Sequence, residues 1–298
     1  MHLNSFMHLN SFMHLNIEQF LWAMVLAAHF LLLIVLMGRE RVARFRWFTA
    51  WVALAAIILV ANHMLHGKLT TVAFYWQTYS ALAIESILGI MVLVELARKI
   101  FSSGRSGLIV KANGWIGWTM VTVAIAIAAV WAWGPWPTRA ALQAEKDQLP
   151  LLIVILIGMK GQLLVSILIV EVALLFRTFG SRFGSGWRSH AQQIALGLST
   201  NALAFLAAQG ITDAISHTAH PKSKPEYDHL VHLVTNIENG RTVVWFLALV
   251  WWIVWLWRDE PGSPEQLAAA GVRVGAGPSQ LKAGAANPLP LEEDKAGQ

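Results

Sequence analysis

The stretch IEQFLWAMVLAAHFLLLIVLM, residues 17–37, is followed at once by GRERVARFR, residues 38–46. The first segment has the length of about 20 residues that a helix needs to cross about 30 Å of hydrocarbon. Four arginines follow it and no basic segment precedes it. Because basic residues stay on the cytoplasmic side, the two segments predict an uncleaved membrane-spanning helix that enters from outside.

Six more apolar stretches follow this first one. A soluble chain would carry about 25% charged residues, whereas here 13% are charged and 56% are hydrophobic. The surplus apolar surface must face lipid, so we predict an all-α, polytopic bundle of seven transmembrane helices. The predicted spans are Ile17 to Met37, Trp47 to Leu65, Val72 to Ala97, Gly114 to Trp136, Leu149 to Phe176, Ala191 to Ile215 and Thr242 to Trp257.

The loops between these spans are alternately rich and poor in basic residues. Eleven Lys and Arg residues fall in the loops after spans one, three and five, and six fall in the other loops. This bias places the N-terminus outside and the C-terminus in the cytoplasm. The net charge of +5 therefore indicates contact with lipid headgroups and not with nucleic acid.

Two end segments differ from the predicted membrane domain, residues 17–258. Residues 1–16 repeat the hexapeptide MHLNSF in register, which indicates a dispensable extension and leaves Met1, Met7 or Met13 as the start. Residues 259–298 are rich in Gly, Ala, Pro and Glu and lack an apolar period, so we expect a disordered cytoplasmic tail.

Histidines on the predicted outer side suggest one candidate site. Three His-x-x-His pairs occur there, and residues three apart share a helix face. Neutral imidazole with carboxylate suits zinc, copper, nickel or iron, and the sequence does not choose among these divalent transition metals. Chance occurrence in exposed loops and a proton-sensing cluster are the alternatives. The candidate ligands are His63, His66, Asp213, His217, His220, His229 and His232.

Charges inside the spans suggest a second candidate site. Glu85 and Lys160 lie at matching depths in spans three and five, where a charge tends to face a partner or a cavity. We therefore expect Glu85 and Lys160 to pair across a helix interface, either as a structural pair or as part of a ligand or ion path. Neighbouring polar residues are Gln77, Thr78, Gln162 and Ser166.

Several segments resemble a poorly characterised group of bacterial seven-helix membrane proteins. They are Phe74-Tyr75-Trp76, Glu95-Leu96-Ala97-Arg98-Lys99, Arg177-Thr178-Phe179-Gly180 with Trp187-Arg188-Ser189-His190, and Val244-Trp245 with Trp257-Arg258. The resemblance implies a helical bundle in a bacterial inner membrane and supplies no activity, cofactor or catalytic residue. It does not include the His pairs.

Three functions remain open at this point. The first is a sensory, ligand-binding or scaffold-type membrane protein, which fits the absence of a catalytic constellation and requires an oligomer or membrane partner for output. The second is a transporter of a small solute or ion that uses Glu85 and Lys160. The third is a membrane enzyme with a His-ligated metal. The chain has no cysteine, which excludes thiolate metal sites and cysteine nucleophiles.

Overall fold

Seven α-helices and no β-strands make up the part of the chain that the computed structural model describes, which confirms the predicted all-α class. The described residues are 17–65, 67–102, 107–133, 149–179, 189–219, 221 and 223–259. The helices are α2 (Ile17–Gly38), α3 (Arg46–Leu65), α4 (Thr71–Ser102), α5 (Gly107–Trp133), α7 (Leu149–Phe179), α8 (His190–Thr218) and α9 (Lys224–Trp257).

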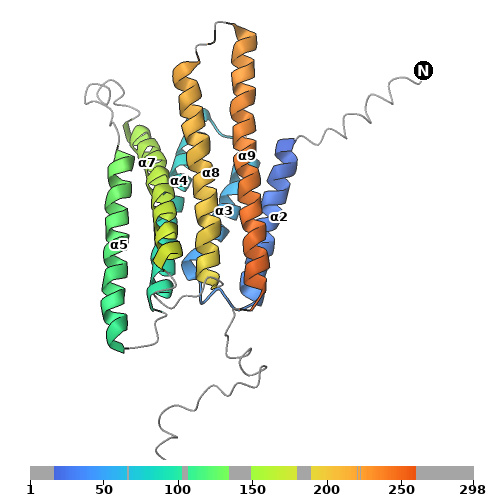
Figure 1. Cartoon of the computed structure of the whole chain (residues 1–298). Helices are drawn as coiled ribbons and strands as arrows, with labels where there is room; N and C mark the ends of the chain where they lie inside the picture. The colour runs from blue at the N-terminus through green and yellow to red at the C-terminus, as the bar shows by residue number, and fades with distance from the viewer. Residues whose placement is uncertain are drawn as a thin grey trace, which may run out of the picture. The chain divides into compact units, whose positions relative to one another are not determined.

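Six of these helices form a closed ring. Each of α2, α3, α4, α7, α8 and α9 packs against the next, and α9 packs back against α2. Helices that follow one another in the chain run in opposite directions, so the ring neighbours α4 and α7 are parallel, as are α9 and α2 (Figure 1). Helix α5 stands outside the ring against α7 and α4. Helices that are far apart in sequence therefore share one interior.

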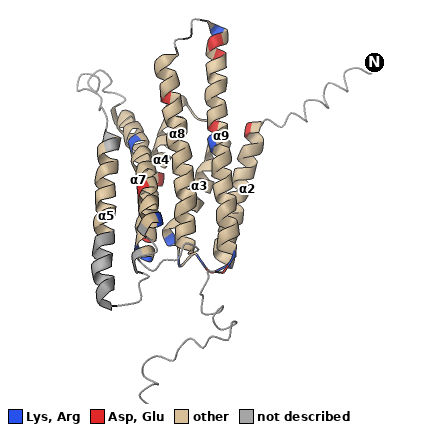
Figure 2. Cartoon of the chain, in the orientation of Figure 1, with Lys and Arg blue, Asp and Glu red and all other residues tan. Residues whose placement is uncertain are grey.

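The outside of this ring is suited to lipid. All six ring helices are long and apolar enough to cross a membrane, and most of their length carries no charged side chain (Figure 2). Large apolar side chains such as Phe30, Ile57 and Leu247 are more than half exposed, and a soluble protein rarely exposes a continuous apolar surface of this kind. The described chain is therefore that of a multi-pass membrane protein. The apolar part of α5 in the described residues is shorter, Trp118–Val130, so a seventh span stays a prediction.

Helix α9 differs from the predicted last span. The prediction began it at Thr242, whereas the structure begins it at Lys224 and gives it 34 residues. Hydropathy marks only the part of a helix that suits hydrocarbon, and the first half of α9 is polar. The local signals for a helix start are nevertheless present, because Ser223 has extended backbone angles and Pro225 and Glu226 lie in the first turn. As a result α8 and α9 extend beyond the other helices at one end of the bundle (Figure 1).

Small residues bring α4 and α7 close together. A Cβ atom on Gly158 would lie 3.0 Å from the Tyr79 carbonyl oxygen, and one on Gly161 would lie 3.2 Å from Ser86 Oγ. In lipid, where water does not drive apolar surfaces together, helices associate through such close backbone packing. These glycines hold two helices in contact along the ring.

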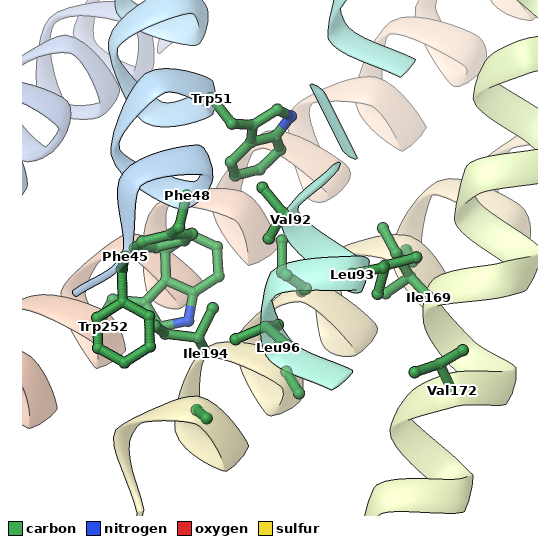
Figure 3. Packing of buried hydrophobic residues seen from close by; sticks show 14 of the residues in the cluster. Phe45, Phe48, Trp51, Val92, Leu93, Leu96, Ile169, Val172, Ile194 and Trp252 are labelled. Atoms are coloured by element: carbon green, nitrogen blue, oxygen red, sulfur yellow. The ribbon is translucent and has the colours of Figure 1, made fainter. Parts of the chain in front are cut away.

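The tightly packed core lies toward one end of the bundle. We call this the basic end, because it carries Arg39, Arg41 and Arg44 in the α2–α3 loop, Arg98 and Lys99 near the end of α4, Arg177 in the last turn of α7 and Arg258 after α9. Its core contains Phe45, Phe48, Leu96, Ile194 and Trp252, all fully or almost fully buried (Figure 3). Phe48 and Trp252 meet edge to face with ring centroids 5.1 Å apart. The interior at this end is thereby filled.

Two polar arrangements fasten the basic end. Glu95 on α4 accepts hydrogen bonds from the backbone amides of Trp47 and Phe48, each at 3.2 Å, and so caps α3 from another helix. Arg41 donates through Nη2 to the Arg258 carbonyl oxygen at 2.7 Å, and its Nη1 contacts the buried ring of His190. Arg41 therefore ties the first loop to the start of α8 and the end of α9.

Candidate functional site: a cavity inside the helix ring

A cavity of about 470 Å³ lies inside the ring, in the part of the bundle away from the basic end. Every ring helix contributes to its wall, and no described residue of α5 does. Glu18, an exposed residue in the first turn of α2, lines it, so the cavity reaches the bundle surface. The polar lining residues are Glu18, His29, Asn62, Thr78, Glu85, Gln162, Asn201, Asn239, Arg241 and Thr242.

Two opposite charges from distant parts of the chain face this cavity. Glu85 of α4 and Arg241 of α9 both line it and are close enough for their charges to interact. Within the described residues, Glu85 has no hydrogen bond or ion pair. Arg241 is held in place by Glu238, whose Oε2 lies 3.0 Å from Nη2, and by the ring of Phe205, whose centroid is 5.7 Å from Cζ.

Aromatic residues form the wall between the cavity and the packed core. Trp51 and Trp245 line the cavity and meet edge to face at 5.5 Å. Each also contacts Trp252 of the core, at 6.3 and 5.5 Å. Aromatic rings packed edge to face therefore close this side of the cavity.

His29 is a buried acceptor at this wall. It is 1% exposed, lines the cavity and has its ring centroid 5.6 Å from that of Trp245. Its Nδ1 donates to the Val25 carbonyl oxygen at 2.7 Å, because a carbonyl can only accept. Nε2 is buried and has no hydrogen-bond partner among the described residues.

Neutral polar side chains also line the cavity, and a smaller second cavity adjoins it. Gln77 donates to Asn62 Oδ1 at 2.9 Å and holds that amide at the wall. A second cavity of about 60 Å³ shares Glu85, Gln162 and Asn201 with the first and reaches Val92. Glu85 thus stands where the larger cavity meets the smaller one.

The structure does not bring Glu85 and Lys160 together in a hydrogen bond or ion pair. Lys160 Nζ donates to the Ala132 carbonyl oxygen of α5 at 3.4 Å, which places it on the outer side of the ring. Gln162, two residues later, lines the cavity. Two residues span about 200° of helix rotation, so matching depth did not imply a matching direction. The charged group that faces Glu85 is Arg241 instead.

The predicted metal ligands lie near the end of the bundle opposite the basic end. His63 is stacked on Trp22 at 4.0 Å, and Asp213 accepts from Gln209 Nε2 at 3.0 Å. His217, His229 and His232 are exposed residues of α8 and α9. The described residues contain no group of three His, Asp or Glu side chains able to hold a metal. His66 and His220 lie outside the described residues, as do the repeat at 1–16 and residues 260–298 of the predicted tail.

Several cavity residues were not predicted as a site. Neither Arg241 nor His29 is among the predicted site residues. Asn201 and Asn239 were not considered, although amides within or beside an apolar segment are a usable signal. The sequence does not show that the helix ring closes. Ring closure places α9 beside α2 and brings both helices within reach of α4.

Comparison of the chain with models of protein families, with characterised proteins and with solved structures finds no match. The cavity itself is therefore the basis for any functional assignment.

Proposed function

We propose that this chain is a ligand-binding membrane protein of the sensory type, which takes up a small polar molecule in the cavity of its helix ring. The observation that carries the proposal is the cavity of about 470 Å³, which is closed on one side by Trp51 and Trp245 and contains both Glu85 and Arg241. Pockets for small molecules have volumes of about 300–1,000 Å³ and a few convergent polar groups.

The basic end defines the orientation that we propose. Lys and Arg are retained on the cytoplasmic side of bacterial inner membranes, so the packed core would face the cytoplasm. The cavity would then open to the outside. A ligand entering from outside would contact all six ring helices at once, and a change in their packing would reach the cytoplasmic end.

A purely structural role explains the cavity less well. Polar groups within a membrane bundle are costly unless they are satisfied, and the cavity wall carries Glu85, which has no hydrogen bond or ion pair in the described part of the chain, together with the amides of Gln162 and Asn201. A structural bundle would be expected to fill or pair these positions. A binding site requires them to be open.

Accessibility can be measured cleanly because the chain has no cysteine of its own. Asn201→Cys places a thiol on the cavity wall, whereas Leu203→Cys, 53% exposed on the same helix, faces away from it. We expect a membrane-impermeant maleimide added to intact cells to label the first variant and not the second. Labelling of Asn201→Cys only in inside-out vesicles would reverse the orientation, and no labelling from either side would reject an open cavity.

Ligand binding is tested by filling the cavity. Ala81 lines it, so Ala81→Phe should abolish thermal stabilisation by any compound that a library screen identifies. Ala23→Phe is the matched control, because Ala23 is an exposed residue of α2 that does not line the cavity. A compound that stabilises wild type and both variants equally would bind elsewhere.

Transport is the second candidate, and the smaller cavity below Glu85 favours it. A transporter would have to open the aromatic wall and the packed core beneath it. Uptake of the bound compound into proteoliposomes would support transport, whereas saturable binding without uptake would support the sensory role.

A further inference from the structure

The charges in the cavity restrict the kind of molecule that it can hold. Glu85 and Arg241 both line the wall, yet neither is bonded to the other in the described structure. Arg241 retains its contacts with Glu238 and Phe205, which orient the guanidinium, while the Glu85 carboxylate has no hydrogen bond or ion pair in the described part of the chain. Glu85 and Arg241 thus present an acid and a base to one space without a bond between them, and Glu18 adds a second carboxylate to the same cavity.

The two charges also occupy different positions along the cavity. Glu85 lines both the large cavity and the small one beyond it, whereas Arg241 lines only the large one. Trp51, which also borders both cavities, stands beside Trp245. Aromatic faces next to a carboxylate favour a cation through cation–π attraction. The deeper part of the site therefore favours a positive group and the part nearer Arg241 a negative one.

Molecules with a single charge fit this arrangement poorly. A simple carboxylate would pair with Arg241. It would also approach the Glu85 carboxylate, which would repel it and would still have no partner. A simple amine would pair with Glu85 and approach Arg241. Each would pair with one charge of the cavity wall and be disfavoured by the other, which is how sites discriminate between related ligands.

Resting on the proposed ligand-binding role, we propose that the ligand is a small organic zwitterion of the amino-acid type. Its ammonium group is received by Glu85 and the aromatic wall, and its carboxylate by Arg241, whose planar fork suits bidentate pairing. The amides of Gln162 and Asn201, which line the cavity together with Glu85, supply neutral hydrogen bonds beside these charges. The volume accommodates a side chain in addition to the two charged groups.

The test uses purified full-length protein in nanodiscs and isothermal titration calorimetry. The probes are the twenty standard L-amino acids and glycine betaine. For L-phenylalanine and for the tightest binder, the probes include the analogue without the amino group and the analogue without the carboxylate, such as 3-phenylpropionate and 2-phenylethylamine. We expect at least one zwitterion to bind and each single-charge analogue to bind about 10- to 100-fold more weakly, as for loss of one charged hydrogen bond.

Variants assign the two charges separately. Glu85→Gln should weaken the zwitterion at least about tenfold but leave the binding of the deaminated analogue unchanged or improved, because that analogue has no ammonium to lose. Arg241→Gln should also weaken the binding of the zwitterion but leave the binding of the decarboxylated analogue unchanged or improved, because that analogue has no carboxylate to lose. Retained binding of an analogue shows that the variant is folded. Glu171→Gln is the matched control, because Glu171 lies in α7 and does not line either cavity.

Three outcomes would overturn the zwitterion assignment. The first is equal affinity for an amino acid and one of its single-charge analogues. The second is a parallel loss of binding of all ligands in Glu85→Gln and Arg241→Gln but not in Glu171→Gln. The third is that no zwitterion probe binds. None of these rejects the proposed function, which fails separately if Asn201→Cys is unreactive and Ala81→Phe leaves every library ligand bound.

Discussion

The contact between Gly197 and Trp252 makes the packed core open to a sharp test. A Cβ atom at Gly197 would lie 2.3 Å from Trp252 Nε1, 2.6 Å from Cε2 and 2.9 Å from Cζ2. Gly197→Ala therefore requires the indole to move by about an ångström to reach ordinary contact distance. Trp252 is fully buried and has Phe48, Trp51 and Trp245 around it, so its movement would displace the cavity wall as well.

The magnitude follows from two opposing terms. Overpacking of a filled core costs about 1–3 kcal/mol, and the fixed position of Trp252 places this variant at the upper end. Replacing Gly by Ala within a helix returns up to about 1 kcal/mol. We expect Gly197→Ala to lower the free energy of unfolding by about 2 kcal/mol.

The same helix supplies the matched control. Gly210 also lies in α8, and a Cβ there would meet nothing within 4 Å. Gly210→Ala should therefore be neutral or stabilising by up to about 1 kcal/mol. Unfolding by SDS, followed by far-ultraviolet circular dichroism in mixed micelles, compares the two variants with wild type.

A compensating substitution completes the test. Trp252→Phe removes part of the ring that the new methyl group would strike, so the double variant with Gly197→Ala should lose less than the sum of the single losses. Strict additivity, or a Gly197→Ala variant as stable as Gly210→Ala, would refute the packing of α9 against α8 described above.

Three further outcomes test the basic end and the histidines. Glu95→Ala should destabilise the bundle by about 1–2 kcal/mol, because two amides at the start of α3 lose their acceptor, and Glu95→Gln should lose less in the same SDS titration. Arg41→Ala should cost about 1.5–3 kcal/mol, and Arg41→Lys should not restore it, because one ammonium cannot reproduce the fork that bridges α8 and α9. Elemental analysis should give the same metal content for wild type and a His63→Ala, His217→Ala variant, and a stoichiometric metal lost in the variant would re-establish the predicted metal site.

Hydropathy predicted the fold well because lipid imposes a strong rule on sequence. A helix that crosses hydrocarbon must satisfy all of its backbone bonds internally and expose apolar side chains. The ends of α2 and α3 consequently lie within about one residue of the predicted spans. The rule does not hold outside the lipid, and the polar first half of α9 was therefore predicted as a loop.

The candidate site could be predicted only in part, for a geometrical reason. Glu85 was identified because an acidic residue within an apolar stretch is costly and needs a purpose. Its neighbour was not identified, because depth can be counted along a sequence but the direction in which a helix faces depends on its partners. Lys160 has a suitable depth and bonds to α5, whereas Arg241 comes from the helix that closes the ring.

The division of the bundle into a filled part and a hollow part suggests how binding would be communicated. Trp245 belongs to both parts, since it lines the cavity and packs on Trp252. Trp252 in turn fills the space left by Gly197 at the start of α8, near the point where Arg41 ties α8 and α9 to the first loop. A ligand that shifts Trp245 must therefore press on a rigid chain of contacts, since packed cores do not deform continuously. If this route operates, Gly197→Ala, which moves Trp252, should reduce the effect of the ligand on the basic end by more than it reduces ligand binding. Equal ligand-induced protection of α8 from hydrogen exchange in both proteins would exclude it.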